Sequence, residues 1–132
     1  MAKASIFIPS NVYTPNTRSV ILPNLTSDDN GVKVILTREA WPDTGGVIVS
    51  GVIEGSNDNW ATSFNLTSFA YAGGVMINPR TLLPVLTVEP TAYWPETYDP
   101  VTGVATPLRP AQVRMVVTNT VTITTSITLT GV

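Results

Sequence analysis

The sequence predicts an all-β domain, an antiparallel β-sandwich with a jelly-roll-like arrangement. Three observations predict this class: short segments in which apolar and polar residues alternate, turn sequences rich in Gly, Asn, Asp and Pro between them, and no capped segment with a 3.6-residue period. The chain has 132 residues, which is the size of one domain. We expect about seven or eight short strands, the usual number for a sandwich.

The first half of the chain contains four segments with the composition of strands. The clearest is 31–39, in which Val32, Val34 and Leu36 alternate with other residues. The sequence DDNG, which tolerates the positive φ angles of a tight turn, leads into this segment. The four predicted strands are 17–26, 31–39, 47–55 and 60–67.

The second half combines weak strands with one long irregular connection. Short strands are expected at 75–77 and 82–88, and residues 89–110 are predicted to form a loop because they contain five prolines. The C-terminal segments 112–118 and 121–130 show the strongest alternation, and the second has one face made mostly of threonines. We expect these two segments to pair as a hairpin.

Residues 1–16 are predicted to form an extended N-terminal arm, outside a single sandwich domain that covers 17–132. Pro9 and Pro15 lack a backbone donor, which disfavours regular structure in this stretch. An apolar arm requires a surface to pack on, which is either a partner protein or, if the arm forms an edge strand, its own sandwich. The arm side chains expected to make these contacts are Ile6, Phe7, Ile8 and Tyr13.

The composition argues against several classes of function. The chain has no cysteine and no histidine, so it lacks a thiol nucleophile, a thiolate metal site and the commonest general base. It also lacks the glycine motifs of nucleotide-binding loops and the Gly-x-Ser-x-Gly motif of serine hydrolases. We therefore expect no enzymatic activity, no cofactor and no metal site.

Charged residues are sparse in this chain. They make up 12% of it, against about 25% in a typical domain, and the net charge is −2. The seven Lys and Arg residues are scattered, whereas nucleic-acid-binding proteins cluster them, so nucleic acid is not an expected partner. The chain lacks the apolar run of a signal peptide or of a membrane helix, which predicts synthesis in a cytoplasm and no membrane contact.

Two kinds of polar cluster have a possible chemical role, but chance and turn formation explain them better. Neighbouring carboxylates such as Glu54 and Asp58 could act as a glycosidase pair, yet such pairs arise by chance among nine acidic residues. The tripeptides 28–30 and 57–59 offer oxygen ligands for calcium without the spacing of an EF-hand. Their composition is typical of turns.

The aromatic residues are the best candidates for contacts with a partner. Trp41 and Trp60 lie beside turns and are expected to close the ends of the core. Tyr93, Trp94 and Tyr98 lie in the proline-rich loop and are expected to be exposed. Exposed aromatic side chains can anchor a protein interface or stack on a sugar ring.

Three stretches share a pattern of strands and turns. They are TRSVILPNLT (17–26), VIVSGVIEGSNDNW (47–60) and QVRMVVTNTVTITTSITLTG (112–131). In style they resemble small phage virion proteins with a jelly-roll-like sandwich, of the capsid cement or decoration type. The resemblance implies a homo-oligomer, often a trimer, that clamps neighbouring copies of the major capsid protein or another virion protein. The arm and the 89–110 loop would make these contacts.

Two other functions fit the same residues. A carbohydrate-binding module or a receptor-binding tip would use Tyr93, Trp94 and Tyr98 as a stacking platform. A tail or baseplate component of the same virion would have the same kind of composition as a capsid decoration protein. In each virion role the protein is made in the host cytoplasm and is located in the virus particle.

Overall fold

The computed structural model describes residues 3–26, 28–39, 41, 46–72 and 87–132. In this part of the chain every regular element is a β-strand, and eleven strands are present. Seven of them contain at least seven residues, and the other four contain two to four. The all-β prediction is confirmed, and the short strands account for the difference from the predicted seven or eight.

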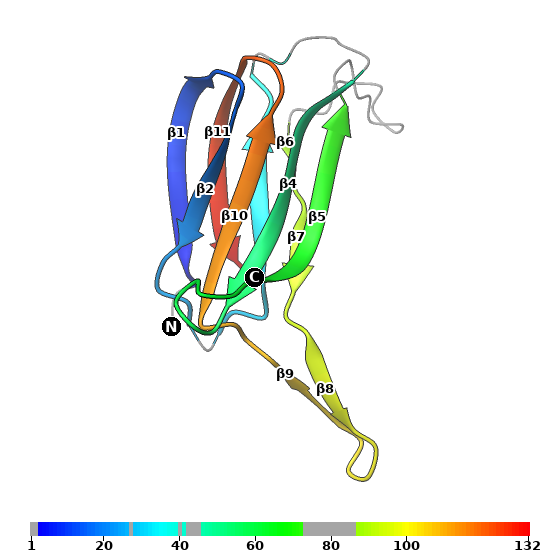
Figure 1. Cartoon of the computed structure of the whole chain (residues 1–132). Coiled ribbons are helices and arrows are strands. Elements are labelled where there is room, and N and C mark those ends of the chain that lie inside the picture. Colours follow the sequence, from blue (N-terminus) through cyan, green and yellow to red (C-terminus); the bar gives the residue numbers. More distant parts are fainter. Residues whose placement is uncertain (1–2, 27, 40, 42–45, 73–86) are drawn as a thin grey trace, which may run out of the picture.

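The long strands form two sheets that face each other as a sandwich (Figure 1). Sheet A has the order β1-β11-β3-β6, and β7 also pairs with β3. Its strands are β1 (Ser5–Tyr13), β11 (Ile123–Gly131), β3 (Gly31–Thr37), β6 (Thr87–Val88) and β7 (Thr91–Tyr93). Sheet B consists, in spatial order, of β2 (Asn16–Leu22), β10 (Gln112–Asn119), β4 (Val47–Ser56) and β5 (Phe64–Ala72). A separate ribbon contains β8 (Glu96–Asp99) and β9 (Val104–Pro107).

The strands pair in a nested order along the chain. β1 pairs with β11, β2 with β10, β3 with β6 and β7, and β4 with β5, always antiparallel. Two further pairs, β3 with β11 and β4 with β10, join these couples into the two sheets. Successive couples thus alternate between the sheets, which is the order of a jelly roll. The predicted sandwich of jelly-roll type is therefore confirmed.

The apolar core lies between the two sheets. Strand β11 shows how the sequence builds it, because Ile123, Thr125, Ile127 and Leu129 are buried while the hydroxyl residues between them are half-buried on the outer face. This is the alternation predicted for the C-terminal segment. Each large apolar side chain contributes about 1.5–3 kcal/mol when it is fully buried. The largest apolar side chains with less than 2% exposure are Leu36, Ile48, Ile53, Met115 and Leu129.

The predicted hairpin between 112–118 and 121–130 is wrong. β10 lies in sheet B and β11 in sheet A, so the short connection between them crosses the sandwich. Thr120 fixes this crossing, because its backbone N–H donates to Ile48 O at 2.9 Å and its hydroxyl donates to Val47 O at 2.8 Å. Alternation shows which side of a strand is buried but not which strand pairs with it. Both strands alternate because each buries one side in the same core, although they lie in opposite sheets.

The predicted N-terminal arm is an edge strand of the sandwich. Residues 5–13 form β1 and pair with β11. Ile6 and Ile8 pack against the core, whereas Phe7 points outward and is 62% exposed. Residues 5–13 therefore take the second of the two placements left open by the sequence, an edge strand on their own sandwich.

The predicted strand at 60–67 begins later, at Phe64. The residues before it form a turn around Asp58, whose Oδ1 accepts bonds from the Ser56 hydroxyl and the Thr62 backbone N–H, both at 2.9 Å. The Thr62 hydroxyl donates to the same carboxylate and is the main cause of an Asp58 pKa below the usual 3.8. The first residues of the predicted strand, 60–63, therefore belong to this turn and its end.

Residues 89–110 are more regular than predicted. They contain β7, β8 and β9, and β8 pairs with β9 as a hairpin. The strand predicted at 75–77 and most of the strand predicted at 82–88 lie outside the described residues. Of the strand predicted at 82–88, only β6 is described. The next strand, β7, pairs with β3 beside β6.

The β1–β2 and β10–β11 connections both cross from one sheet to the other, and both lie at the same end of the sandwich (Figure 1). The side chain of Asn119 links these two connections. Its side chain is 4% exposed. Its amide nitrogen donates to Tyr13 O at 3.2 Å, Thr14 O at 3.0 Å and Val121 O at 2.9 Å. Its Oδ1 accepts a bond of 3.3 Å from Arg18. One amide thus serves carbonyl groups of both the β1–β2 and the β10–β11 connections.

We expect Asn119→Ala to lower the free energy of unfolding by about 1–3 kcal/mol, because carbonyl groups of both connections lose their donor in a partly buried site. Denaturant unfolding followed by circular dichroism measures this change. Asn11→Ala is the matched control, because Asn11 is exposed on β1 and bonds the adjacent Val12 N–H. Equal, small effects of the two substitutions would contradict the role assigned to Asn119.

Deletion of residues 2–16 is expected to destabilise the whole sandwich, because it removes β1 and uncovers one edge of β11. Differential scanning calorimetry should show a large drop in melting temperature or loss of the cooperative transition. Phe7→Ser, at an outward position of the same strand, should leave the melting temperature nearly unchanged. An unchanged transition after the deletion would mean that β1 is dispensable.

Candidate functional site

The ribbon β8–β9 extends away from one end of the sandwich (Figure 1). Its register pairs Glu96 with Pro107 and Asp99 with Val104, and all eight strand residues are exposed. Its strands pair with each other and with no other described strand. A two-stranded ribbon of this kind is marginally stable in water unless it packs against something. A ribbon that projects without cover is therefore a candidate for contact with a partner.

The base of the ribbon is fixed in the body by Trp94. This side chain is only 4% exposed, and its indole N–H donates to Asp29 O at 2.7 Å in a buried hydrogen bond. The Trp94 backbone N–H donates to Asn30 O at 3.0 Å, and the Leu108 N–H donates to Pro95 O at 2.7 Å. Both strands of the ribbon therefore leave the sandwich from a hydrogen-bonded base.

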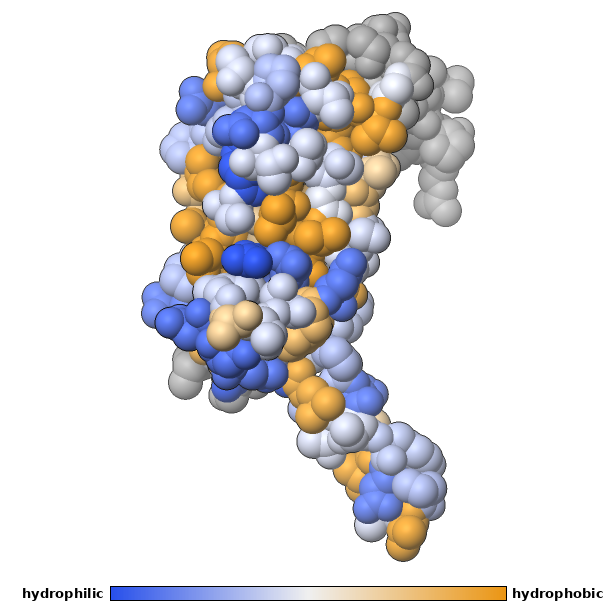
Figure 2. Space-filling model, viewed as in Figure 1, coloured by the Kyte–Doolittle hydropathy of each residue, from blue (hydrophilic) through white to orange (hydrophobic). Residues whose placement is uncertain are grey.

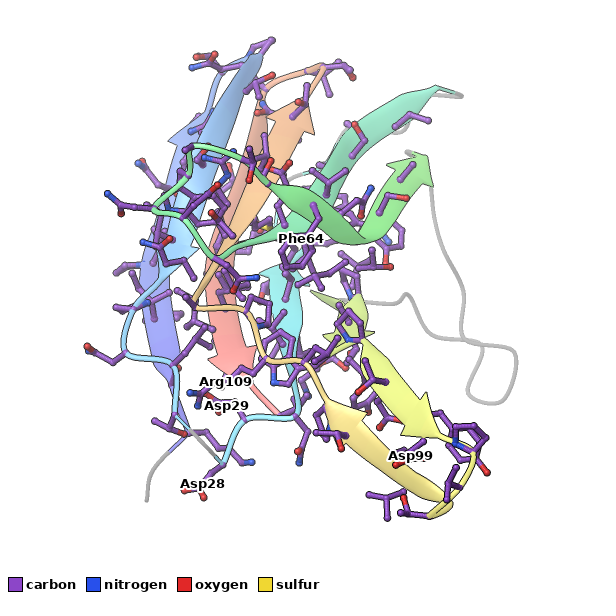
Figure 3. All side chains as sticks on the ribbon, turned by 60° about the horizontal axis from the view of Figure 1, so that its bottom comes forward. Asp28, Asp29, Phe64, Asp99 and Arg109 are labelled. Atoms are coloured by element: carbon purple, nitrogen blue, oxygen red, sulfur yellow. The ribbon has the colours of Figure 1, made fainter. Side chains whose placement is uncertain are left out.

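Asp29 holds the turn on which Trp94 rests. It is 2% exposed, and its Oδ2 accepts a bond of 2.9 Å from the Thr26 N–H. The carboxylate packs so closely on Gly131 that a methyl group there would overlap it. The neighbouring Asn30 N–H donates to Val132 O at 2.6 Å. The β2–β3 turn, the end of β11 and the base of the ribbon thus form one packed corner, in which Figure 3 labels Asp29.

The tip of the ribbon is closed by Asp99, which Figure 3 labels near its end. The Asp99 carboxylate accepts bonds from the Val101 N–H at 2.9 Å and the Thr102 N–H at 3.4 Å. Gly103 completes the turn with a φ of 73° and donates its N–H to Asp99 O at 2.8 Å. The bond from Val101 is the main reason why the pKa of Asp99 lies below its usual 3.8.

The ribbon and its base carry the main exposed apolar surface. Of the ten large apolar side chains exposed among the described residues, five lie between positions 93 and 108. Figure 2 shows apolar groups along the ribbon and at its end. Exposed apolar surface gathered on one element is typical of a protein interface. The five residues are Tyr93 (69% exposed), Tyr98 (67%), Val101 (90%), Val104 (55%) and Leu108 (49%).

The residues predicted for the interface do not form one surface. Tyr93 and Tyr98 are exposed at the ribbon, but the predicted exposure of Trp94 is wrong because its ring is part of the core. Tyr13 is half-buried on β1, with the Arg18 guanidinium 4.1 Å from its ring centroid. The strands β1 and β7 lie at opposite edges of sheet A, which separates the two predicted groups. Of the β1 group, Ile6 and Ile8 face the core and Phe7 faces outward.

Three exposed apolar residues, Val101, Val104 and Leu108, are not among the contact candidates predicted from the sequence. A signal was present, because Asp99-Pro100 followed by Gly103 is a turn sequence flanked on both sides by strand-forming residues. The five prolines of 89–110 favour a loop, but only Pro107 lies within a strand of the hairpin, at its end.

The other tryptophans are covered by arginines. Trp41 packs against the core, as predicted, with Arg38 5.4 Å from its ring centroid. Trp60 does not close the core. It has a positive φ of 71°, and the Arg114 guanidinium lies 4.1 Å from its ring centroid. Arg114 is in turn paired with Glu54 at 3.0 Å on the outer side of sheet B.

The predicted sugar-stacking platform is not assembled. It required Tyr93, Trp94 and Tyr98 to present their rings together, whereas Trp94 is buried at the base of the ribbon. Within the described residues, no cluster of three or more His, Cys, Asp or Glu side chains is arranged to hold a metal ion. That part of the chain also contains no helix long and apolar enough to cross a membrane.

Comparison of the chain with protein families, with curated proteins and with solved structures found no match.

The turn at Asp99 should depend on pH. Its pKa is lowered in the folded state, so its contribution is fully present above pH 3.8 and is lost as the pH falls from there through the lower folded value. We expect the amide signal of Val101 in NMR spectra to titrate with a midpoint below 3.8. Asp99→Ala should abolish this titration, and a midpoint at or above 3.8 would show that the carboxylate does not hold the turn.

Proposed function

We propose that this chain is a non-enzymatic structural protein of a virus particle, of the phage capsid decoration type, that binds neighbouring coat subunits through the β8–β9 ribbon. The single observation that carries the proposal is the projecting ribbon with exposed apolar side chains on a fixed base. The ribbon supplies a contact surface, and the jelly-roll body supplies a rigid support. Nothing in this mechanism requires a reacting group.

The ribbon suits a structural contact for energetic reasons. Its base is held by Trp94 and its tip by Asp99, so a partner need not order it on binding, which reduces the entropic cost of association. Tyr98 offers a large aromatic side chain, the residue type that most often dominates the energy of protein interfaces. The ribbon carries only two charges, Glu96 and Asp99, so burying it removes few charges from water.

The fold and the composition support the same proposal by analogy. Jelly rolls occur in viral capsid proteins and also in lectins and cupins, so the fold alone does not decide among them. The sparse charge of the surface favours a protein that is largely covered by neighbours. A capsid protein gains stability when many weak contacts act together on one particle.

The location of the protein tests the proposal directly. Immunogold labelling of particles purified from the host that carries the gene should place the label on capsids. Label confined to tails would replace the decoration role with the tail or baseplate alternative. Particles without any label would contradict a virion role.

Tyr98→Ala should weaken binding to particles that lack this protein by roughly 30-fold, which corresponds to about 2 kcal/mol for a buried aromatic anchor. Co-sedimentation of the purified variant with these particles measures the change. Thr106→Ser, at an outward position on the opposite face of the ribbon, is the matched control and should bind as the wild type does. Equal binding of wild type and Tyr98→Ala would exclude the ribbon as the main contact.

A further inference from the structure

The described strands of the two sheets leave four edges, and three of these edges carry features that disfavour pairing with another strand. β1 contains Pro9 and an irregular register beside it. β2 lies between Pro15 and Pro23 and has the charged Arg18 at an inward position, opposite the buried Val117. Prolines, irregular pairing and inward-pointing charges are the usual means by which proteins protect a sheet edge.

The edge formed by β6 and β7 is protected in the same way. The two strands contain two and three residues, and Pro90 interrupts them. Pro90 O accepts the Val34 N–H at 2.9 Å, so the chain keeps its path beside β3, but the proline offers no donor to a further strand. A short, interrupted edge is a poor template for pairing.

The edge strand β5 lacks proline and inward-pointing charge, and a regular stretch of five residues lies between two irregularities in its register. Its nine residues, FNLTSFAYA, include no proline and no charged residue. Its register on β4 shifts twice, between Asn65 and Thr67 and between Tyr71 and Ala72, and is regular from Thr67 to Tyr71. Among the described strands, β5 pairs with β4 alone, so no described strand pairs with its other edge. Ser68 and Ala70 are small and exposed on the outer face of this strand, so they place no bulky or charged side chain beside a second copy.

We propose that β5 is a self-association edge, on which the β5 strand of a second copy of this chain pairs in antiparallel orientation. A second copy fits because antiparallel pairing of one strand with itself has two-fold symmetry, the commonest symmetry of protein dimers. The two copies of sheet B would then form one continuous eight-stranded sheet. The absence of like charges on β5 removes the repulsion that self-pairing otherwise creates.

The surface beside this edge fits the same partner. An open trough of about 500 Å³ runs over the outer face of sheet B, along β10, β4 and β5. Its walls include the small side chains Ser50, Ser68 and Ala70, and no charged side chain lines it. Figure 2 shows apolar groups across the middle of this face. Pairing at β5 would place the uncharged outer faces of both copies side by side in one sheet, without a charged side chain from this trough at the junction.

A strand-edge contact is smaller than the roughly 800 Å² per partner of a standard interface, so we expect a weak dimer with a Kd on the order of 100 μM. Sedimentation velocity of the full chain from about 10 μM to about 1 mM covers this range. Hydrogen exchange at the two ends of the range adds a local measurement, because the outward amides of β5 become protected only in the dimer.

Ser68→Lys combined with Ala70→Lys tests the edge, because two lysines per strand meet their copies across the two-fold axis. We expect the dimer to weaken at least about tenfold. Ser19→Lys is the matched control, since Ser19 is exposed on β2 at the opposite edge of sheet B. Circular dichroism confirms that each variant is folded.

Each outcome decides the proposal. It stands if the wild type dimerises, the β5 amides alone gain protection and only the double variant dissociates. It is overturned if the wild type remains a monomer at the highest concentration, or if Ser19→Lys weakens the dimer as much as the double variant does. The test uses the isolated chain and needs no virus particle, so its result is independent of the proposed capsid role.

Discussion

Two connections leave one sheet and enter the other at the same end of the sandwich, and a single amide, that of Asn119, satisfies carbonyl groups in both. A strand that leaves its sheet loses its ladder partners, and a buried carbonyl without a donor costs about 1–3 kcal/mol. Asparagine supplies donors and an acceptor from one short side chain, so it can serve Tyr13, Thr14 and Val121 while accepting from Arg18. These hydrogen bonds of Asn119 fix the pair β1–β11 relative to the pair β2–β10. The other pairs join the same sheets, because β3 pairs with β11 and β4 pairs with β10.

The ribbon at the other end depends on a comparable corner. Trp94 reaches from the base of the ribbon into the core, and its indole bonds the backbone of Asp29. Asp29 in turn packs on Gly131, where only glycine leaves room for the carboxylate. The position of the ribbon is thus set by residues of the β2–β3 turn and the end of β11, far from it in sequence. A rigid base with an exposed tip is the arrangement that presents a contact surface at low entropic cost.

The sequence predicted the fold class and much of the core, but less of the candidate site. Alternation of Ile123, Ile127 and Leu129 with threonines identified the buried face of β11, because period-two patterns report burial. The same pattern contains no information about which strand lies next to which, so it predicts neither that β10 and β11 lie in different sheets nor that β1 pairs with β11. Trp94 was misplaced because the burial of an aromatic residue in a proline-rich segment depends on distant partners, here Asp29. The expected exposure of Tyr98 is confirmed, because this residue lies in the proline-rich segment beyond the packed base.

The sparse charge of the chain gives proline a role that lysine has in many sheet proteins. Pro9, Pro15, Pro23 and Pro90 lie within or beside three of the four edges, and β5 has neither proline nor charge. Since antiparallel pairing at β5 reverses the strand direction between copies, the two ribbons of such a dimer would point to opposite ends of the joined sheet. A dimer of this geometry could not grip one partner with both ribbons, but it could connect two partners that lie on either side of it. Self-pairing at β5 and binding through the ribbon would therefore act together as a bridge, with the avidity that two linked contacts provide.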